Sequence, residues 1–170
     1  MYGPLLALPE ELIKAASLFC GFRGVITLEP RLFNVFLEEL VEQGELGEIP
    51  VEGLSTFKQF LLENGLLTPL THNLRDTEIY RLTPFLPQFI RRHIDDNTQE
   101  VIQKGFIGYY NLLSQKLRVD LVDNNPEVRA IADEFIAIEK ENFLSALWIS
   151  PDKSPTAFTH ILGVIFRQLT

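Results

Sequence analysis

The chain has 170 residues, a formal net charge of -8 and a composition that is 46% hydrophobic and 11% aromatic. This apolar content suffices for a packed core and disfavours a disordered chain, while the acidic balance disfavours general binding to nucleic acid or anionic membranes. The single cysteine, Cys20, excludes an internal disulfide, and neither a signal peptide nor the ~20 consecutive apolar residues of a membrane-spanning helix is found. We therefore expect a cytoplasmic protein with one globular domain or two small ones.

The first 65 residues indicate three helices. Apolar residues recur at helical spacing in residues 9–19, 28–43 and 51–65. We expect the first helix to stop within residues 20–24, where two glycines break the pattern. Thr27 is predicted to be the N-cap of the second helix, and Asn64 and Gly65 to end the third in a left-handed turn.

A β-hairpin is predicted next. Residues 66–70 and 78–82 have the length and apolar content of strands, and residues 71–77 supply a polar turn. Thr83 is then the expected N-cap of a closing helix that begins at Pro84 and runs to about Ile94. Three helices, a hairpin and a closing helix predict a winged-helix domain over about residues 5–94, in which the hairpin is the wing.

Residues from about 95 to 170 predict a second, helical domain. Residues 95–103 are polar and are compatible with a hinge or with the start of a helix. The residues that follow place one apolar face on a helix, which consists of Phe106, Tyr109, Tyr110, Leu113 and Leu117.

A long helix is predicted to begin at Asn125 and Pro126 and to end near Leu147, before a turn at residues 150–153. Its apolar positions at helical spacing are Val128, Ile131, Phe135 and Ile138. Ser154 and Pro155 begin a last helix that is apolar on most sides and so needs several neighbours. We therefore expect an antiparallel, TPR-like segment and a polypeptide that continues past Thr170.

Three stretches carry a family resemblance: Glu63-Asn64-Gly65-Leu66-Leu67, Tyr80-Arg81-Leu82-Thr83-Pro84 and the segment from Ile138 to Ile149. Together with the order of the elements, they resemble the region after the nucleotide-binding core of STAND signal-transduction ATPases, which include the NB-ARC proteins. There a winged helix connects the ATPase to tetratricopeptide-type (TPR) repeats. The resemblance implies a non-catalytic regulatory module within a larger signalling ATPase, with a protein partner or the neighbouring ATPase domain bound to it.

One position departs from that family. In many members a histidine that senses the ADP phosphate lies just before the closing helix of the winged domain, and Thr83 occupies this position here. A threonine hydroxyl donates one hydrogen bond but cannot be cationic, which puts nucleotide sensing in doubt. A plain helix N-cap is the simpler interpretation of Thr83.

The residue patterns of catalysis and metal binding are not found in the sequence. It has neither the Gly-x-x-x-x-Gly-Lys-Ser/Thr loop that wraps phosphates nor a Gly-x-Ser-x-Gly nucleophile turn. His72, His93 and His160 lie far apart, which disfavours a zinc site. Cys20 lies among apolar residues and is expected to be a buried, inert thiol, although Arg23 nearby leaves a reactive thiol as the alternative. We expect no catalytic residue, cofactor or metal.

Two groups of residues are candidates for interaction. The one basic cluster consists of Arg81, Arg91 and Arg92. Its cations either stabilise the C-terminal end of a helix, where the helix dipole favours positive charge, or contact a phosphate or partner. The aromatic residues of the second domain either belong to its core or line a groove for a peptide, and the candidates are Tyr109, Tyr110 and Trp148.

DNA binding by a transcription regulator is the alternative function, because winged helices often insert their third helix into the major groove. Between Val51 and Asn64 that helix has one basic residue, Lys58, against Glu52 and Glu63. Such a surface repels a phosphate backbone, so the charge pattern favours a protein partner.

Overall fold

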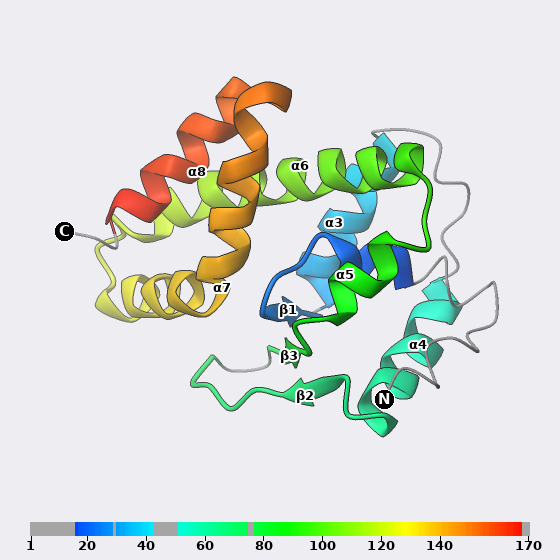
Figure 1. Ribbon diagram of the computed structural model, residues 1–170. Helices are drawn as coiled ribbons and strands as arrows, with labels where there is room; N and C mark the ends of the chain where they lie inside the picture. Colours follow the sequence, from blue (N-terminus) through cyan, green and yellow to red (C-terminus); the bar gives the residue numbers. More distant parts are fainter. Residues whose placement is uncertain (1–15, 29, 43–50, 75–76, 168–170) are drawn as a thin grey trace.

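A computed structural model describes residues 16–28, 30–42, 51–74 and 77–167 of the chain (Figure 1). These residues are mainly helical and include a small antiparallel sheet. None of the helices in these ranges is long and apolar enough to cross a membrane. In chain order the elements are a 3-10 helix η1 (Leu18–Cys20), β1 (Val25–Thr27), α3 (Pro30–Glu42), α4 (Val51–Glu63), β2 (Leu67–Pro69), β3 (Ile79–Leu82), α5 (Leu86–Arg91), α6 (Asp96–Asp120), α7 (Pro126–Lys153) and α8 (Pro155–Arg167).

The three strands form one antiparallel sheet in the order β1-β3-β2. The predicted hairpin is confirmed as β2 and β3, and Gly65 has the expected positive φ of 65° after α4. Strand β1 was not predicted. Thr27 is its last residue and pairs with Ile79, so the prediction of Thr27 as a helix N-cap is wrong. Its backbone is held extended by the ladder to β3, and α3 begins later, at Pro30.

The predicted N-cap role of Thr83 is also wrong. Helix α5 begins at Leu86, and its N-cap, Phe85, makes no side-chain capping bond. The hydroxyl of Thr83 donates instead to the carbonyl oxygen of Leu66 over 3.0 Å, and the backbone N–H of Thr83 donates to the same oxygen. Thr83 therefore joins the end of β3 to the residues that follow α4.

The long helices extend further than predicted. The polar residues 95–103 are the start of α6, because the Asp95 side chain accepts from Thr98 N over 2.8 Å as an N-cap. Helix α7 passes through Pro151 and ends at Lys153, so the predicted end near Leu147 is wrong. Pro151 has no N–H for the carbonyl of Leu147, and the Ser150 hydroxyl donates to that carbonyl over 3.0 Å.

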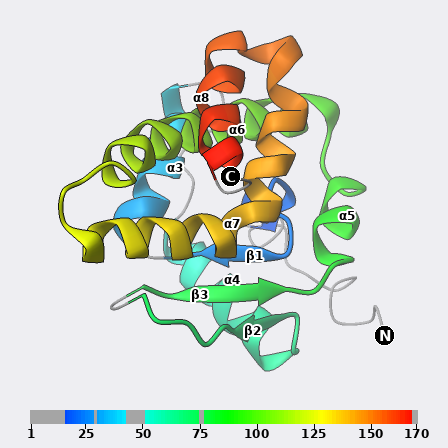
Figure 2. The same cartoon turned by 90° about the vertical axis from the view of Figure 1, so that its left-hand side faces the viewer.

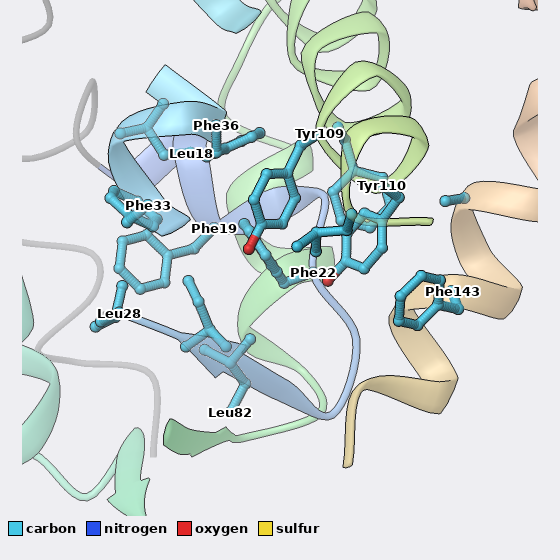
Figure 3. Close-up of a cluster of buried hydrophobic side chains, with 14 of the residues drawn as sticks. Leu18, Phe19, Phe22, Leu28, Phe33, Phe36, Leu82, Tyr109, Tyr110 and Phe143 are labelled. Carbon is cyan, nitrogen blue, oxygen red and sulfur yellow. The ribbon is translucent and has the colours of Figure 1, made fainter. Parts of the chain in front are cut away.

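A chain of aromatic rings joins α3, α6 and α7 in the core (Figure 3). Ring centroids lie 5.7 Å apart for Phe36 and Tyr109, 5.1 Å for Tyr109 and Tyr110, and 4.9 Å for Tyr110 and Phe143. The core is continuous across both predicted domain ranges, 5–94 and 95–170, and the boundary between them stays a prediction. The predicted apolar face of α6 is confirmed, since all five of its residues are buried.

The predicted apolar face of α7 is correct only in part. Phe135 is buried and Ile138 partly so, but Ile131 is 52% exposed. The face that α7 buries is one position further round the helix and includes Ala132, Phe135, Ile136, Glu139, Asn142, Phe143 and Ala146. Figure 2 shows that α7 passes along β1 and then changes direction to pack beside α6 and α8, so this face contacts all three elements.

Helices α3 and α6 approach closely at a glycine. A Cβ placed on Gly105 of α6 would lie 2.4 Å from Cδ2 of Leu40 and 3.3 Å from its Cα. Leu40 is fully buried, so it cannot turn into solvent to make room, and its backbone Cα is close as well. Gly105 therefore sets the distance at which α6 crosses α3.

Candidate functional site

Two polar residues, Glu139 and Asn142, lie inside the buried face of α7. Glu139 is 1% exposed and Asn142 is 0% exposed. One carboxylate oxygen of Glu139 accepts from the Thr27 hydroxyl. The other accepts from the Tyr110 hydroxyl over 2.7 Å and from Nδ2 of Asn142 over 2.6 Å. These bonds connect α7 to both β1 and α6.

Burial controls the ionisation of this network. It raises the pKa of Glu139, although the hydrogen bonds from Thr27, Asn142 and Tyr110 act in the opposite direction. Burial also holds the pKa of Tyr110 well above its usual value, with a further contribution from the charge of Glu139. No polar atom of the network faces solvent, so we interpret it as a device that positions α7.

Asn142 also completes the free edge of the sheet. Residues 24, 26 and 28 of the chain direct their backbone groups toward β3, as the bonds of Gly24 O and Leu28 N show. Arg23 N and Val25 O point the other way. Oδ1 of Asn142 accepts from Arg23 N, and Nδ2 donates to Val25 O over 2.9 Å. The side-chain amide thus takes the place of a peptide group in a neighbouring strand.

A surface groove of about 510 Å³ lies beside this network, and we call it the Trp148 groove. Trp148, near the end of α7, is 87% exposed in this groove. Leu144, one helical turn earlier, is 37% exposed in the same groove. The residues that line it come from the segment after η1 and from α5, α6 and α7, namely Gly21, Arg23, Arg91, Gln103, Phe106, Glu141, Leu144, Ser145, Trp148 and Ile149.

Two guanidinium groups meet in the Trp148 groove. The carbonyl oxygen of Cys20 accepts from Nη1 of Arg23 over 3.2 Å, and from Nε and Nη2 of Arg91 over 3.1 Å and 2.9 Å. Arg23 Nη1 also donates to Phe22 O over 3.0 Å. Two positive charges are thereby fixed next to each other, although their electrostatic repulsion opposes this arrangement.

The structure brings together two of the residues that the sequence nominated. Arg91 and Trp148 lie on α5 and α7 and line the same groove. Arg92 is exposed at the C-terminal end of α5 and Arg81 is exposed on β3, and neither lines the groove.

The other nominated residues lie in the interior or at its border. Tyr109 and Tyr110 are buried in the aromatic chain of the core. Thr83 is partly exposed and bonded to Leu66 O. Nothing in its surroundings assigns a ligand to it.

Sequence reasoning missed Arg23, Glu141 and Leu144 as members of the groove. Leu144 and Trp148 are four residues apart and lie outside the stripe that α7 buries, which is a detectable signal of an exposed apolar pair. The proximity of Arg23 to Arg91 had no signal, because 67 intervening residues fold back before the two meet at Cys20.

The cysteine and the histidines lie in ordinary structural positions. Cys20 is buried, as predicted, and burial raises the pKa of its thiol to about 11 although the charge of Arg91 acts against this. His160 on α8 lies 2.7 Å from Oδ1 of Asn111 through its Nδ1, and His93 stacks on Phe89. Within the described ranges, no three His, Cys, Asp or Glu side chains gather to form a metal site.

A second groove, of about 440 Å³, lies between α6, α7 and the segment after β2. The exposed side chain of Ile131 lines it together with Leu113 and Leu117. Its charged residues are Lys116 and the acidic Asp120, Glu127 and Glu134, and Glu134 already accepts from the backbone of residue 73 over 2.9 Å. The lining of this groove is therefore acidic on balance, in contrast to the paired arginines of the Trp148 groove.

Comparisons of the chain with protein-family models, with curated proteins and with solved structures gave no match.

Proposed function

We propose that this chain is a non-catalytic protein-interaction module of a STAND-type signalling ATPase, and that the Trp148 groove binds its protein partner. The observation that carries the proposal is the 87% exposure of Trp148 beside Leu144. A large aromatic ring in water is costly unless a partner covers it, and tryptophan is enriched among the residues that dominate binding energy at interfaces.

The order of the elements supports a winged-helix arrangement. Around an antiparallel sheet, the chain forms in order helical residues, β1, two helices, the β2–β3 hairpin and α5. Helices α7 and α8 are joined through Ser154 alone and pack against each other, which is the kind of helical pair that TPR repeats stack. Both features agree with the resemblance to the region after a nucleotide-binding core.

The proposed mechanism is mechanical. The winged-helix part docks on a neighbouring ATPase domain, and partner binding at α7 is relayed to it. Asn142 and Glu139 supply the connection, because they bond the middle of α7 to β1 and lie close in sequence to Glu141 and Leu144 of the groove. A partner that moves this part of α7 therefore acts on the sheet as well.

The alternative, a DNA-binding regulator, receives less support from α4. Lys58 forms an ion pair with Glu78, the residue just before β3, and its Nζ lies 4.9 Å from the ring centroid of Tyr80. Burial opposes the charge of Lys58, but the hydrogen bonds to Glu78 and Tyr80 outweigh it and raise the pKa. The exposed side chains of the described part of α4 are Ser55, Thr56, Gln59 and Glu63, none of which is cationic.

The test is affinity capture of a partner from the source cell by the full chain, in wild-type and Trp148→Ala forms. The matched control is Phe166→Ala, which removes another exposed aromatic side chain, 58% exposed on α8 and outside the groove. We expect wild type and Phe166→Ala to capture the same protein and Trp148→Ala to lose most of it.

Equal capture by all three forms would overturn the role of the groove. If instead the chain captures no protein and shifts duplex DNA at physiological salt, the DNA-binding alternative replaces the proposal. We expect exchange of Arg91 and Arg92 for glutamate to weaken binding to a neighbouring ATPase domain. Because Arg91 also lines the groove, the single change Arg92→Glu separates docking from partner binding.

A further inference from the structure

We propose that the Trp148 groove binds an acidic linear segment of a partner protein. A carboxylate of the segment binds the Arg23–Arg91 pair, and an adjacent apolar side chain packs on Leu144 and Trp148. This inference rests on the proposed function and specifies the chemistry of the partner.

The first argument is the unbalanced charge of the arginine pair. Both guanidinium groups donate to one carbonyl oxygen, that of Cys20, at 2.9–3.2 Å. Lys58, Lys104 and Lys153 form ion pairs with glutamates, but within the described ranges neither Arg23 nor Arg91 is paired with a carboxylate. A carboxylate placed between the two guanidiniums relieves their mutual repulsion and completes their coordination.

The second argument is the geometry of the remaining donors. The hydrogen bonds to Cys20 O and Phe22 O use Nη1 of Arg23, and Nε and Nη2 of Arg91. Nε and Nη2 of Arg23 take part in none of these bonds, whereas Arg91 also contacts the Cys20 thiol, so Arg23 supplies the donors for a ligand and Arg91 adds positive charge. Because the bonds to the backbone fix both side chains, little conformational entropy is lost when an anion binds.

The third argument separates a peptide from a free anion. An inorganic anion would use only the arginines, whereas the groove also carries the exposed side chains of Leu144 and Trp148 one turn apart on α7. Gln103 and Ser145 add polar groups for a peptide backbone. An extended acidic segment with an apolar residue satisfies all of these features together.

Glu141 gives the proposal a test of opposite sign. Its carboxylate lines the same groove and offsets part of the positive charge. A ligand with carboxylates is repelled by it, while a cationic ligand would be attracted. Glu141 is exposed, so its replacement by glutamine leaves the core unchanged.

The experiment uses the intrinsic fluorescence of the full chain, because Trp148 is its one tryptophan. The probe is a terminally blocked peptide with two glutamates on each side of a leucine, and its control has glutamine at all four acidic positions. We expect the acidic peptide to shift the Trp148 emission saturably, more weakly as salt rises, and the glutamine peptide to leave it unchanged.

Variants then assign the residues. We expect Arg23→Gln and Arg91→Gln each to weaken binding by about tenfold, and the exposed neighbour Arg92→Gln to have no effect. Glu141→Gln is expected to tighten binding by about twofold. Because Arg91 also holds Cys20 O, circular dichroism and urea unfolding of each variant are recorded, and the Glu141→Gln result stands even if Arg91→Gln fails to fold.

Equal binding of both peptides, or no effect of Glu141→Gln together with none of Arg23→Gln, would overturn the inference. Displacement of the peptide by inorganic phosphate at matching affinity would overturn it in favour of a phosphate site. If the peptide does not bind while Trp148→Ala still abolishes partner capture, the acidic chemistry is wrong but the proposed function stands. If capture is independent of Trp148, the proposed function itself is wrong.

Discussion

Tyr110 donates its hydroxyl hydrogen to a carboxylate oxygen of Glu139 over 2.7 Å, at a point where neither side chain reaches solvent. The bond joins the middle of α6 to the middle of α7. A buried carboxyl group makes the free energy of unfolding depend on pH, and replacing it with a side chain that cannot ionise should remove that dependence.

The first prediction concerns the charge of Glu139. Burial raises its pKa above that of the same group in the unfolded chain, so the folded protein holds the proton more tightly. The resulting stability is complete below the unfolded pKa and is lost as the pH rises through the folded pKa. Between the two values, the free energy of unfolding is expected to fall by up to about 1.4 kcal/mol per pH unit.

Glu139→Gln is expected to lack this loss, because its amide can donate to Thr27 and accept from Tyr110 without ionising. Urea unfolding followed by circular dichroism across the pH range measures the difference between the two proteins. Glu141→Gln, an exposed position on the same helix, serves as the control and should follow the wild-type curve. Parallel curves for wild type and Glu139→Gln would show that Glu139 does not titrate as we expect.

The second prediction concerns Asn142. Asn142→Leu leaves Arg23 N and Val25 O without partners and removes a donor from Glu139. Each unpaired buried group costs about 1–3 kcal/mol, so we expect the free energy of unfolding to fall by about 2–4 kcal/mol.

Chemical denaturation measures this loss, and hydrogen exchange of the Arg23 amide should speed up in the same variant. Asn124→Leu, at an exposed position between α6 and α7, is the control and is expected to change stability by no more than about 0.5 kcal/mol. Similar stability of the two variants would mean that water replaces the side-chain amide at no cost.

The third prediction concerns two glycines in helices. Gly105→Ala places a methyl group 2.4 Å from Leu40 Cδ2 and is expected to destabilise the fold by about 1–3 kcal/mol. Gly163→Ala in α8 meets its nearest atom at 4.0 Å, on Arg118, and should stabilise the fold by up to about 1 kcal/mol through helix propensity. Thermal unfolding of both variants gives the two signs, and a stabilised Gly105→Ala would show that Leu40 can move aside.

Sequence reasoning predicted the elements whose signal is long and local. The apolar face of α6 repeats over several turns, and Gly65 is a residue type that ends helices. Strand β1 has three residues, too few for an alternating pattern, and its pairing with β3 depends on residues more than 50 positions away. Thr27 was therefore assigned by its local capping preference, and the distant strand decided its structure.

The candidate site was predictable only in its exposed parts. Of the three aromatic candidates, which the sequence assigns either to the core or to a groove, Trp148 alone is exposed, whereas Tyr109 and Tyr110 belong to the core. The stripe that α7 buries includes positions 132, 135, 136, 139, 142, 143 and 146. Glu139 and Asn142 fall within this spacing, so their burial was detectable in principle. Their partners were not, because Thr27, Tyr110 and Arg23 come from other elements that only the fold brings together.

The contact between Asn142 and β1 also bears on self-association. A strand at the border of a sheet is a template on which a second chain can add, and such additions lead to aggregates. Asn142 already occupies the outward carbonyl of Val25 in β1 and the outward amide of Arg23 just before it. At the opposite border of the sheet, β2 ends in Pro69, which has no amide hydrogen to offer. A chain truncated between α6 and α7 lacks Asn142 and therefore leaves the border at β1 uncovered. We expect this truncated chain to precipitate under conditions in which the full chain stays monodisperse.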